Sequence, residues 1–173
     1  MLAAIFMPLK FLILFVLLAT HFLTNGQRKT TRLINPTGSY KLDGKTTIKH
    51  GDKYGYFGEL KVKLLNNSKI AISFFICKGA PSYNTGAFID TLKYQHNKAI
   101  YKTPEYDTTC QISFTFTEKG ASVEQHQADI NFGCGFGHAV FANGFYKKSS
   151  TKVPIIYDLE DKYNGTNGIL RKN

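Results

Sequence analysis

The stretch Asn131–Val140, NFGCGFGHAV, gathers the residue types of this chain that are best suited to chemistry. Its glycines follow a G-x-G-x-G spacing, with Cys134 between them and His138 directly after them. A phosphate-binding loop instead needs G-x-G-x-x-G between a strand and a helix, so that the N-terminus of the helix faces the anion. The residues that follow, HAVFANGFYKK, have the pattern of a strand. The spacing therefore argues against a nucleotide site.

The three cysteines, Cys77, Cys110 and Cys134, are candidates for a crosslink. Cys110 begins an alternating strand pattern, the chain turns near Gly120, and Cys134 follows where the chain returns to the start of that strand. We expect a Cys110–Cys134 disulfide, which closes a loop of about 25 residues and stabilises the fold by about 3 kcal/mol. Pairing of Cys77 with either of the other two is the open alternative. If Cys77 is free, its place at the end of an apolar strand predicts a buried thiol.

Metal and catalytic motifs are missing from the sequence. The histidines outside the N-terminal apolar region form no H-x-H, H-x-x-x-H or H-E-x-x-H pair, and no Cys/His pair has zinc spacing; these histidines are His50, His96, His126 and His138. No two carboxylates are placed by local spacing for acid–base work, and Ser82 lacks a G-x-S-x-G context. We therefore expect no metal, no cofactor and no enzymatic activity.

Alternation of apolar and polar residues predicts β-strands along most of the chain. The segment Gly58–Cys77 alternates on both sides of a turn at Asn66–Ser68, which is typical of a β-hairpin. A second half-buried strand is predicted at Cys110–Thr117, and Ala121–Gln125 is expected to pair with it after a turn at Gly120. Further strands are expected at Gly38–Asp43, Gly86–Gln95, Lys98–Lys102 and His138–Lys148.

About eight short strands separated by turn residues indicate an all-β fold. We expect a small antiparallel barrel with meander order, similar to calycins, and the alternative is a β-sandwich. The barrel is favoured because closing the sheet removes its edges.

The N-terminus has the features of a signal peptide. Lys10 precedes the apolar run Phe11–Ala19, which is too short to cross a bilayer comfortably, and Thr24 and Gly26 fit a cleavage site before Gln27. An uncleaved anchor is the alternative. Cleavage predicts a secreted or periplasmic protein without a membrane span. The expected parts are the signal peptide (1–26), a flexible N-terminal segment (27–37), the barrel (38–150) and a polar tail (151–173).

The chain is strongly basic, with 22 Lys and Arg against 12 Asp and Glu and a net charge of +10. An excess of positive charge favours anionic partners, such as phosphorylated glycans, anionic lipid surfaces or acidic proteins. The lysines are scattered rather than clustered, so solubility alone also accounts for them. No feature indicates specific binding of nucleic acid, and we expect a monomer.

Two runs, TCQISFTFTEKGASVEQ and CGFGHAVFANGFYKK, resemble a family of small secreted domains of Gram-negative bacteria. That family has a Cys-led strand, a turn and a further strand, followed by C-G-F-G and G-x-Y-K-K, and it is sometimes associated with lysozyme-inhibitor modules. The match covers about Gly38–Lys148, and its specific part is Thr109–Lys148. The resemblance implies a small antiparallel barrel, export, and pairing of Cys110 with Cys134. Cys77 and the segment KGAPSYNTGAFIDTL depart from the family pattern.

The function expected from these observations is a non-catalytic β-domain that binds a protein, a glycan or an anionic surface of the cell envelope. Lysozyme inhibition is one form of this function that the resemblance implies, although lysozymes are commonly basic and would be repelled by a basic partner. The alternative is a lipocalin-like carrier of a small apolar ligand. The cavity of such a carrier would be lined by Phe74, Phe88, Phe114, Phe116 and Phe141.

The binding residues are expected in two loops. Lys78–Thr85 is rich in turn-forming residues and offers Tyr83 and Asn84 for stacking and polar contacts. Phe136 and His138 lie in the glycine-rich segment beside the expected disulfide, which would stiffen the backbone before binding. If the two loops lie at the same end of the barrel they form one binding surface; otherwise they are unrelated turns.

Overall fold

The computed structural model describes residues 32–66, 68–103 and 107–156. The expected signal peptide, the first part of the N-terminal segment and residues 157–173 of the tail lie outside the described residues. The compact unit that holds the barrel begins at Leu33. The first strand of the barrel begins at Gly38.

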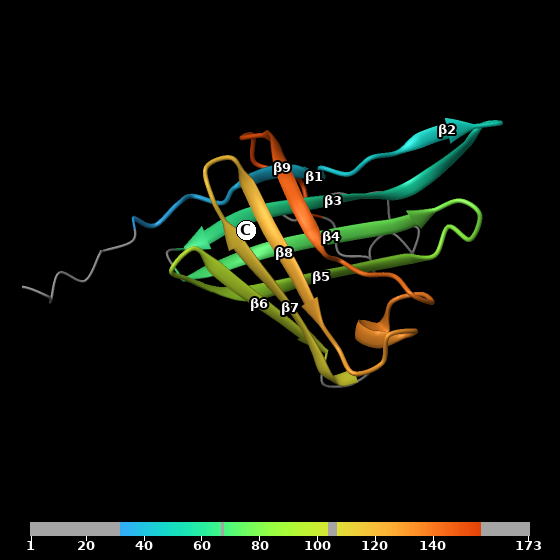
Figure 1. Cartoon of the computed structure of the whole chain (residues 1–173). Helices are drawn as coiled ribbons and strands as arrows, with labels where there is room; N and C mark the ends of the chain where they lie inside the picture. The colour runs from blue at the N-terminus through green and yellow to red at the C-terminus, as the bar shows by residue number, and fades with distance from the viewer. Residues whose placement is uncertain (1–31, 67, 104–106, 157–173) are drawn as a thin grey trace, which may run out of the picture. The chain divides into compact units, whose positions relative to one another are not determined.

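Within the described residues the chain forms nine strands and one short 3₁₀ turn at Gly133–Gly135 (Figure 1). The strands are β1 (Gly38–Leu42), β2 (Thr47–Lys49), β3 (Asp52–Asn66), β4 (Lys69–Gly79), β5 (Thr85–Gln95), β6 (Lys98–Thr103), β7 (Asp107–Phe116), β8 (Gly120–His126) and β9 (Gly144–Ser150). From β3 to β9, each strand pairs antiparallel with its neighbour along the chain. β1 lies between β9 and β3 and closes the ring of eight strands, and β2 pairs with β3 outside that ring. This confirms a closed eight-stranded antiparallel barrel with meander order, rather than a sandwich.

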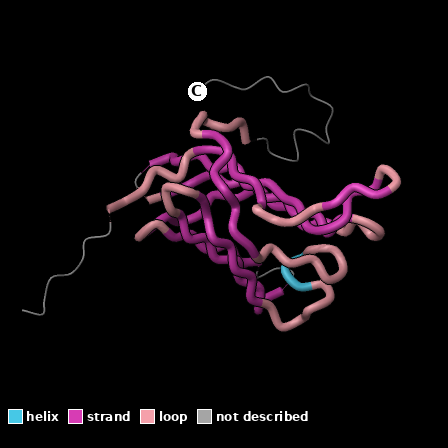
Figure 2. Tube along the Cα trace, turned by 45° about the horizontal axis from the view of Figure 1, so that its top comes forward, coloured by secondary structure: helices cyan, strands magenta, loops and turns pink. Residues whose placement is uncertain are grey.

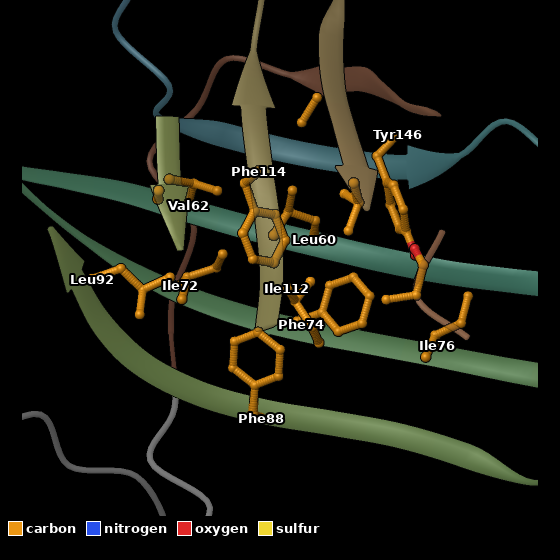
Figure 3. Close-up of a cluster of buried hydrophobic side chains, with 14 of the residues drawn as sticks. Leu60, Val62, Ile72, Phe74, Ile76, Phe88, Leu92, Ile112, Phe114 and Tyr146 are labelled. Atoms are coloured by element: carbon orange, nitrogen blue, oxygen red, sulfur yellow. The ribbon is translucent and has the colours of Figure 1, made fainter. Parts of the chain in front are cut away.

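The barrel interior is filled by aromatic rings that point inward from strands on opposite sides (Figure 3). The ring of Phe74 lies with its centroid 5.4 Å from that of Phe88, 5.9 Å from Phe114 and 5.6 Å from Tyr146. An eight-stranded barrel has an interior of the width that side chains can fill. Of the five phenylalanines proposed to line a ligand cavity, four belong to this core and Phe141 is only half-buried.

Buried tyrosines tie the N-terminal segment to one end of the barrel. The Tyr94 hydroxyl donates to the Ile34 carbonyl (2.7 Å), and the side-chain oxygen of Asn97 accepts the Ile34 N–H (2.7 Å). The Tyr40 hydroxyl donates in the same way to the carbonyl of Pro36. Burial raises the pKa of Tyr94 to about 12, because the phenolate would lose its hydration.

The strand expected at His138–Lys148 is wrong in its first half, because β9 begins only at Gly144. Just before β9, hydrogen bonds to side chains replace the backbone hydrogen bonds that a strand would make. The Gln125 side-chain oxygen accepts the Ala142 N–H (2.6 Å), and the Asn143 side-chain oxygen accepts the Gln125 N–H (2.6 Å). Ala142 and Asn143 are therefore bonded to β8 through side chains without pairing as a strand.

The hairpin of β2 and the start of β3 was not expected from the sequence. It turns at His50 and Gly51, which have positive φ angles of 52° and 88°. All three residues of β2 are exposed, so the alternation that reveals a half-buried strand is missing. Figure 1 shows this hairpin extending beyond the barrel.

Candidate functional site

The two loops that the sequence singled out lie side by side at one end of the barrel. The Asn84 side-chain amide donates to the His138 carbonyl (3.0 Å), although 54 residues separate them in sequence. The Gly137 N–H donates to the Thr85 carbonyl (2.9 Å). Figures 1 and 2 show both loops and the β2–β3 hairpin at this end, with the 3₁₀ turn in the loop before β9. The two segments therefore form one continuous surface.

Tyr83 joins the β2–β3 hairpin to this surface. Its hydroxyl donates to the Asp52 carboxylate (2.8 Å) and accepts the Lys53 N–H (3.0 Å), and the Ala80 N–H donates to the Lys53 carbonyl (2.8 Å). The hydrogen bond to Asp52 raises the pKa of the Tyr83 phenol, because only the protonated phenol can donate it. The peptide bond between Ala80 and Pro81 is cis. We call the surface formed by residues 47–54, 78–85 and 130–138 the rim.

The rim exposes several aromatic and apolar side chains among polar ones. The ring of His138 lies edge-on to that of Phe132, with centroids 5.3 Å apart. Phe132 is 61% exposed, Ile130 is 65% exposed and Tyr83 is 40% exposed. Phe132 and Ile130 were not singled out from the sequence, although two large apolar residues within the polar loop QADINFG were a signal that could have found them.

Asn84 and Phe136 hold the rim together rather than face solvent. Phe136 is 4% exposed and stacks on Phe74 with centroids 6.3 Å apart. Its ring also covers Gly86, where an added Cβ would lie 2.4 Å from the ring. This corrects the expectation that Phe136 contacts a ligand: its ring anchors the loop in the core. Asn84 is half-buried, and its side-chain amide donates its hydrogen bond to the neighbouring loop.

The disulfide expected from the sequence is present. The Cys110 and Cys134 sulfurs are 2.07 Å apart, with Cα atoms separated by 5.0 Å. Cys134 has a φ of 62° and Gly135 a φ of 68°, so two successive residues adopt the left-handed conformation in which a glycine is least strained. Cys77 is the free, buried thiol, and its sulfur accepts the N–H of Gly79 at 3.4 Å. The alternative pairings of Cys77 are therefore excluded.

Asp107 fastens the disulfide loop to the first residues of β7. One carboxylate oxygen accepts the hydroxyl (2.6 Å) and the N–H (2.9 Å) of Thr109, and the other accepts the Cys134 N–H (3.2 Å). These hydrogen bonds, the Thr109 hydroxyl first, lower the pKa of the Asp107 carboxyl. The base of the rim is thus fixed by a covalent bond and by a charged hydrogen-bond acceptor.

The chemistry that the rim offers is contact and hydrogen bonding. Within the described residues, no three His, Cys, Asp or Glu side chains are grouped as metal ligands. Nor does the described part of the chain contain a helix with the length and apolar character needed to cross a membrane.

Comparison with known proteins finds no relative: no protein-family model matches the chain, and no curated protein or solved structure is significantly similar to it. The resemblance to the secreted Gram-negative family therefore stays a prediction.

Proposed function

We propose that this protein is an exported, non-catalytic binding domain of the cell envelope and that its rim binds an acidic protein. The observation that supports this most strongly is the bonding of three separate segments into one surface with Tyr83, Phe132 and His138 on it. The N-terminal apolar run supports export, as does the disulfide, because disulfides persist in oxidising compartments.

The composition of the rim favours a protein partner. Aromatic side chains are enriched among the few residues that dominate binding energy at protein interfaces, and Tyr83 and Phe132 are both accessible. The hydrogen bonds among the three segments hold these side chains in place before binding, so little conformational entropy is lost.

The charges beside the rim favour an acidic partner. The Lys53 ammonium lies 4.1 Å from the centroid of Phe57, and that of Lys49 lies 6.0 Å from the centroid of Tyr54. The carboxylates of the rim and its base already accept hydrogen bonds: Asp52 from Tyr83, and Asp129 from the backbone of the loop that carries Phe132. Lys49, Lys53 and Lys78 outnumber Asp52, the one carboxylate of the rim, so the rim is positively charged and a basic lysozyme is disfavoured.

The carrier alternative has less support, because aromatic side chains occupy the barrel interior. Phe74 contacts the rings of Phe88, Phe114 and Tyr146 at the centre of the barrel. A ligand there would have to displace packed side chains, at a cost comparable to that of overpacking a core.

The test measures binding of the labelled, exported chain to isolated envelopes of the cells that produce it. We expect saturable binding, and the part of it that depends on the rim should disappear when the envelopes are digested with protease. Tyr83→Ala and Phe132→Ala should each weaken binding about tenfold or more, which is the effect of truncating an interface anchor. Ile100→Ala is the matched control, since Ile100 is a 47%-exposed apolar residue on the wall of the barrel.

Two results would contradict the proposal. Binding that survives protease digestion and is still weakened by Tyr83→Ala and Phe132→Ala would identify a glycan or a lipid surface as the partner of the rim. Equal weakening by Ile100→Ala and by the rim variants would show that the contact is a general apolar one and does not use the rim.

A further inference from the structure

A groove of about 680 Å³ runs along the outer face of β9, away from the rim. Phe145 lies in it near the first residues of β9, Lys147 lies along it, and Lys152 lies beyond the last residue of the strand. The turn between β7 and β8 forms one side through Glu118 and Lys119. We call this surface the lysine groove. Its volume is within the range of about 300–1,000 Å³ that is usual for small-ligand sites.

Three ammonium groups in the lysine groove are available to a ligand. Lys119, Lys147 and Lys152 are exposed and form no ion pair with the described part of the chain. Lys147 also lies directly opposite Lys41 of β1, and like charges in this position repel each other. Lys148 is not available in the same way, because its ammonium donates to the Asn35 carbonyl (3.4 Å) and lies over the ring of Tyr40. An anion bound in the groove would relieve the repulsion.

Phe145 provides a flat apolar surface among these cations. Its ring covers Gly120 of β8, and a Cβ added at Gly120 would lie 2.6 Å from the ring. The absence of a side chain at Gly120 thus allows the ring of Phe145 to lie against the sheet. Phe145 is nevertheless 37% exposed. A planar apolar face flanked by cations suits a ligand that is apolar on one face and anionic at its periphery.

Hydroxyl and carboxylate groups complete the lining. Ser150 accepts the Lys152 N–H (3.1 Å) through its hydroxyl oxygen, and Thr151 is exposed beside it. Asp43 and Glu118 line the same groove and supply acceptors for hydroxyl donors. Such a mixture of hydroxyls, acceptors, cations and one aromatic face matches the groups on a sugar acid better than those on a bare anion.

We propose that the lysine groove binds an acidic saccharide. Lys119, Lys147 and Lys152 would contact its carboxylate or phosphate groups, and Phe145 would pack against the apolar face of a sugar ring. The groups of the groove that accept hydrogen bonds would contact the sugar hydroxyls. The lysine groove shares no residue with the rim, so this site and the proposed protein-binding function fail or succeed independently.

The test measures binding of the exported chain to short oligogalacturonate by calorimetry. Neutral malto-oligosaccharide of the same length and a glutamate peptide with the same number of carboxylates serve as comparison ligands. We expect oligogalacturonate to bind, the neutral sugar not to bind, and the peptide to bind about tenfold more weakly. Binding should weaken as salt is raised, because ions screen the lysines.

Variants assign the binding to the groove. Lys119→Gln with Lys147→Gln should weaken oligogalacturonate binding about tenfold. Lys63→Gln with Lys69→Gln removes the same charge from exposed positions of the β3–β4 hairpin and should have little effect. Phe145→Leu keeps an apolar cover over Gly120 but removes the flat ring, and it should weaken binding of the saccharide but not of the peptide.

Three outcomes would overturn the proposal. These are no binding of oligogalacturonate, equal effects of the two double variants, and equal affinity for the peptide and the saccharide. The second would reduce the site to net charge, and the third would remove the role of the sugar ring. Melting temperatures close to that of the parent chain would show that each variant is folded.

Discussion

Phe136 lies in the core and Phe132, four residues earlier, lies on the surface, with the 3₁₀ turn between them. The sequence identifies both rim loops through their turn-forming residues, but it does not indicate which side chains face inward. Periodicity gives that information in strands and is absent from an irregular loop. Tyr83 and His138 are exposed as expected, whereas the position of Phe136 follows from its packing on Gly86 and Phe74.

At the same scale, Asp107 predicts a pH dependence of stability. Its pKa is lower in the folded chain than in the unfolded chain, so the stability it supplies is present above the ordinary carboxyl pKa. That stability is lost as the pH falls through the lower, folded pKa. Asp107→Asn should lower the melting temperature at neutral pH and should flatten its decline in acid.

The measurement is the melting temperature between about pH 7 and about pH 2, the range in which carboxylates titrate. Glu124→Gln is the control, because Glu124 is an exposed carboxylate on β8. Curves for Asp107→Asn that run parallel to those of the parent chain at all pH values would refute the role of this carboxylate.

The strands themselves were predicted where one face is buried and the other is wet. The β3–β4 hairpin and the β7–β8 pair show this alternation, and both are present in the expected positions. Two segments were predicted incorrectly, for opposite physical reasons. β2 is exposed on both faces and carries no hydrophobic signal. Residues 138–143 carry a strand-like pattern, but Ala142 and Asn143 bond to Gln125 of β8 through side chains instead of a strand ladder.

Asn143 should therefore matter for the start of β9. Asn143→Ala leaves the Gln125 N–H without its acceptor, and an unpaired, largely buried amide costs about 1–3 kcal/mol. Asn143→Asp keeps an acceptor oxygen at the same position and should retain most of the stability. Urea unfolding compares the two variants. Equal stability of the Ala and Asp variants would show that the bond contributes nothing.

For the whole molecule, the meander barrel was predictable because most of its strands follow one another with short turns, and only the two pairings of β1 are needed to close it. These two pairings, which place β1 between β9 and β3, join segments far apart in the sequence and have no local signal. The convergence of the two rim loops depends on the same closure. The sequence could therefore state only that they would meet if they lay at one end.

A filled interior predicts the effect of emptying it. Phe74→Ala should lower the free energy of unfolding by about 3–5 kcal/mol and leave a cavity that binds xenon or benzene. Phe75→Ala is the matched control, since the neighbouring side chain is 38% exposed. The parent chain should bind no small apolar probe. Tight binding of such a probe by the parent chain would favour the carrier alternative.

The position of β1 also sets the order in which folding can be completed. The Ser149 hydroxyl donates to the Ser39 carbonyl (3.0 Å) across 110 residues of sequence. A chain that emerges from its N-terminus can pair β1 with β3 early, but β1 and β8 keep one unpaired side each until β9 arrives. β9, the last strand of the described residues, is thus the one that closes the barrel. Contacts between residues so far apart in sequence slow folding. Until β9 is in place, the unpaired edges of β1 and β8 can pair with strands of other chains and lead to aggregation. The time that passes before β9 pairs with β1 and β8, or a chaperone that binds the incomplete barrel during that time, would therefore determine what fraction of the chains aggregates.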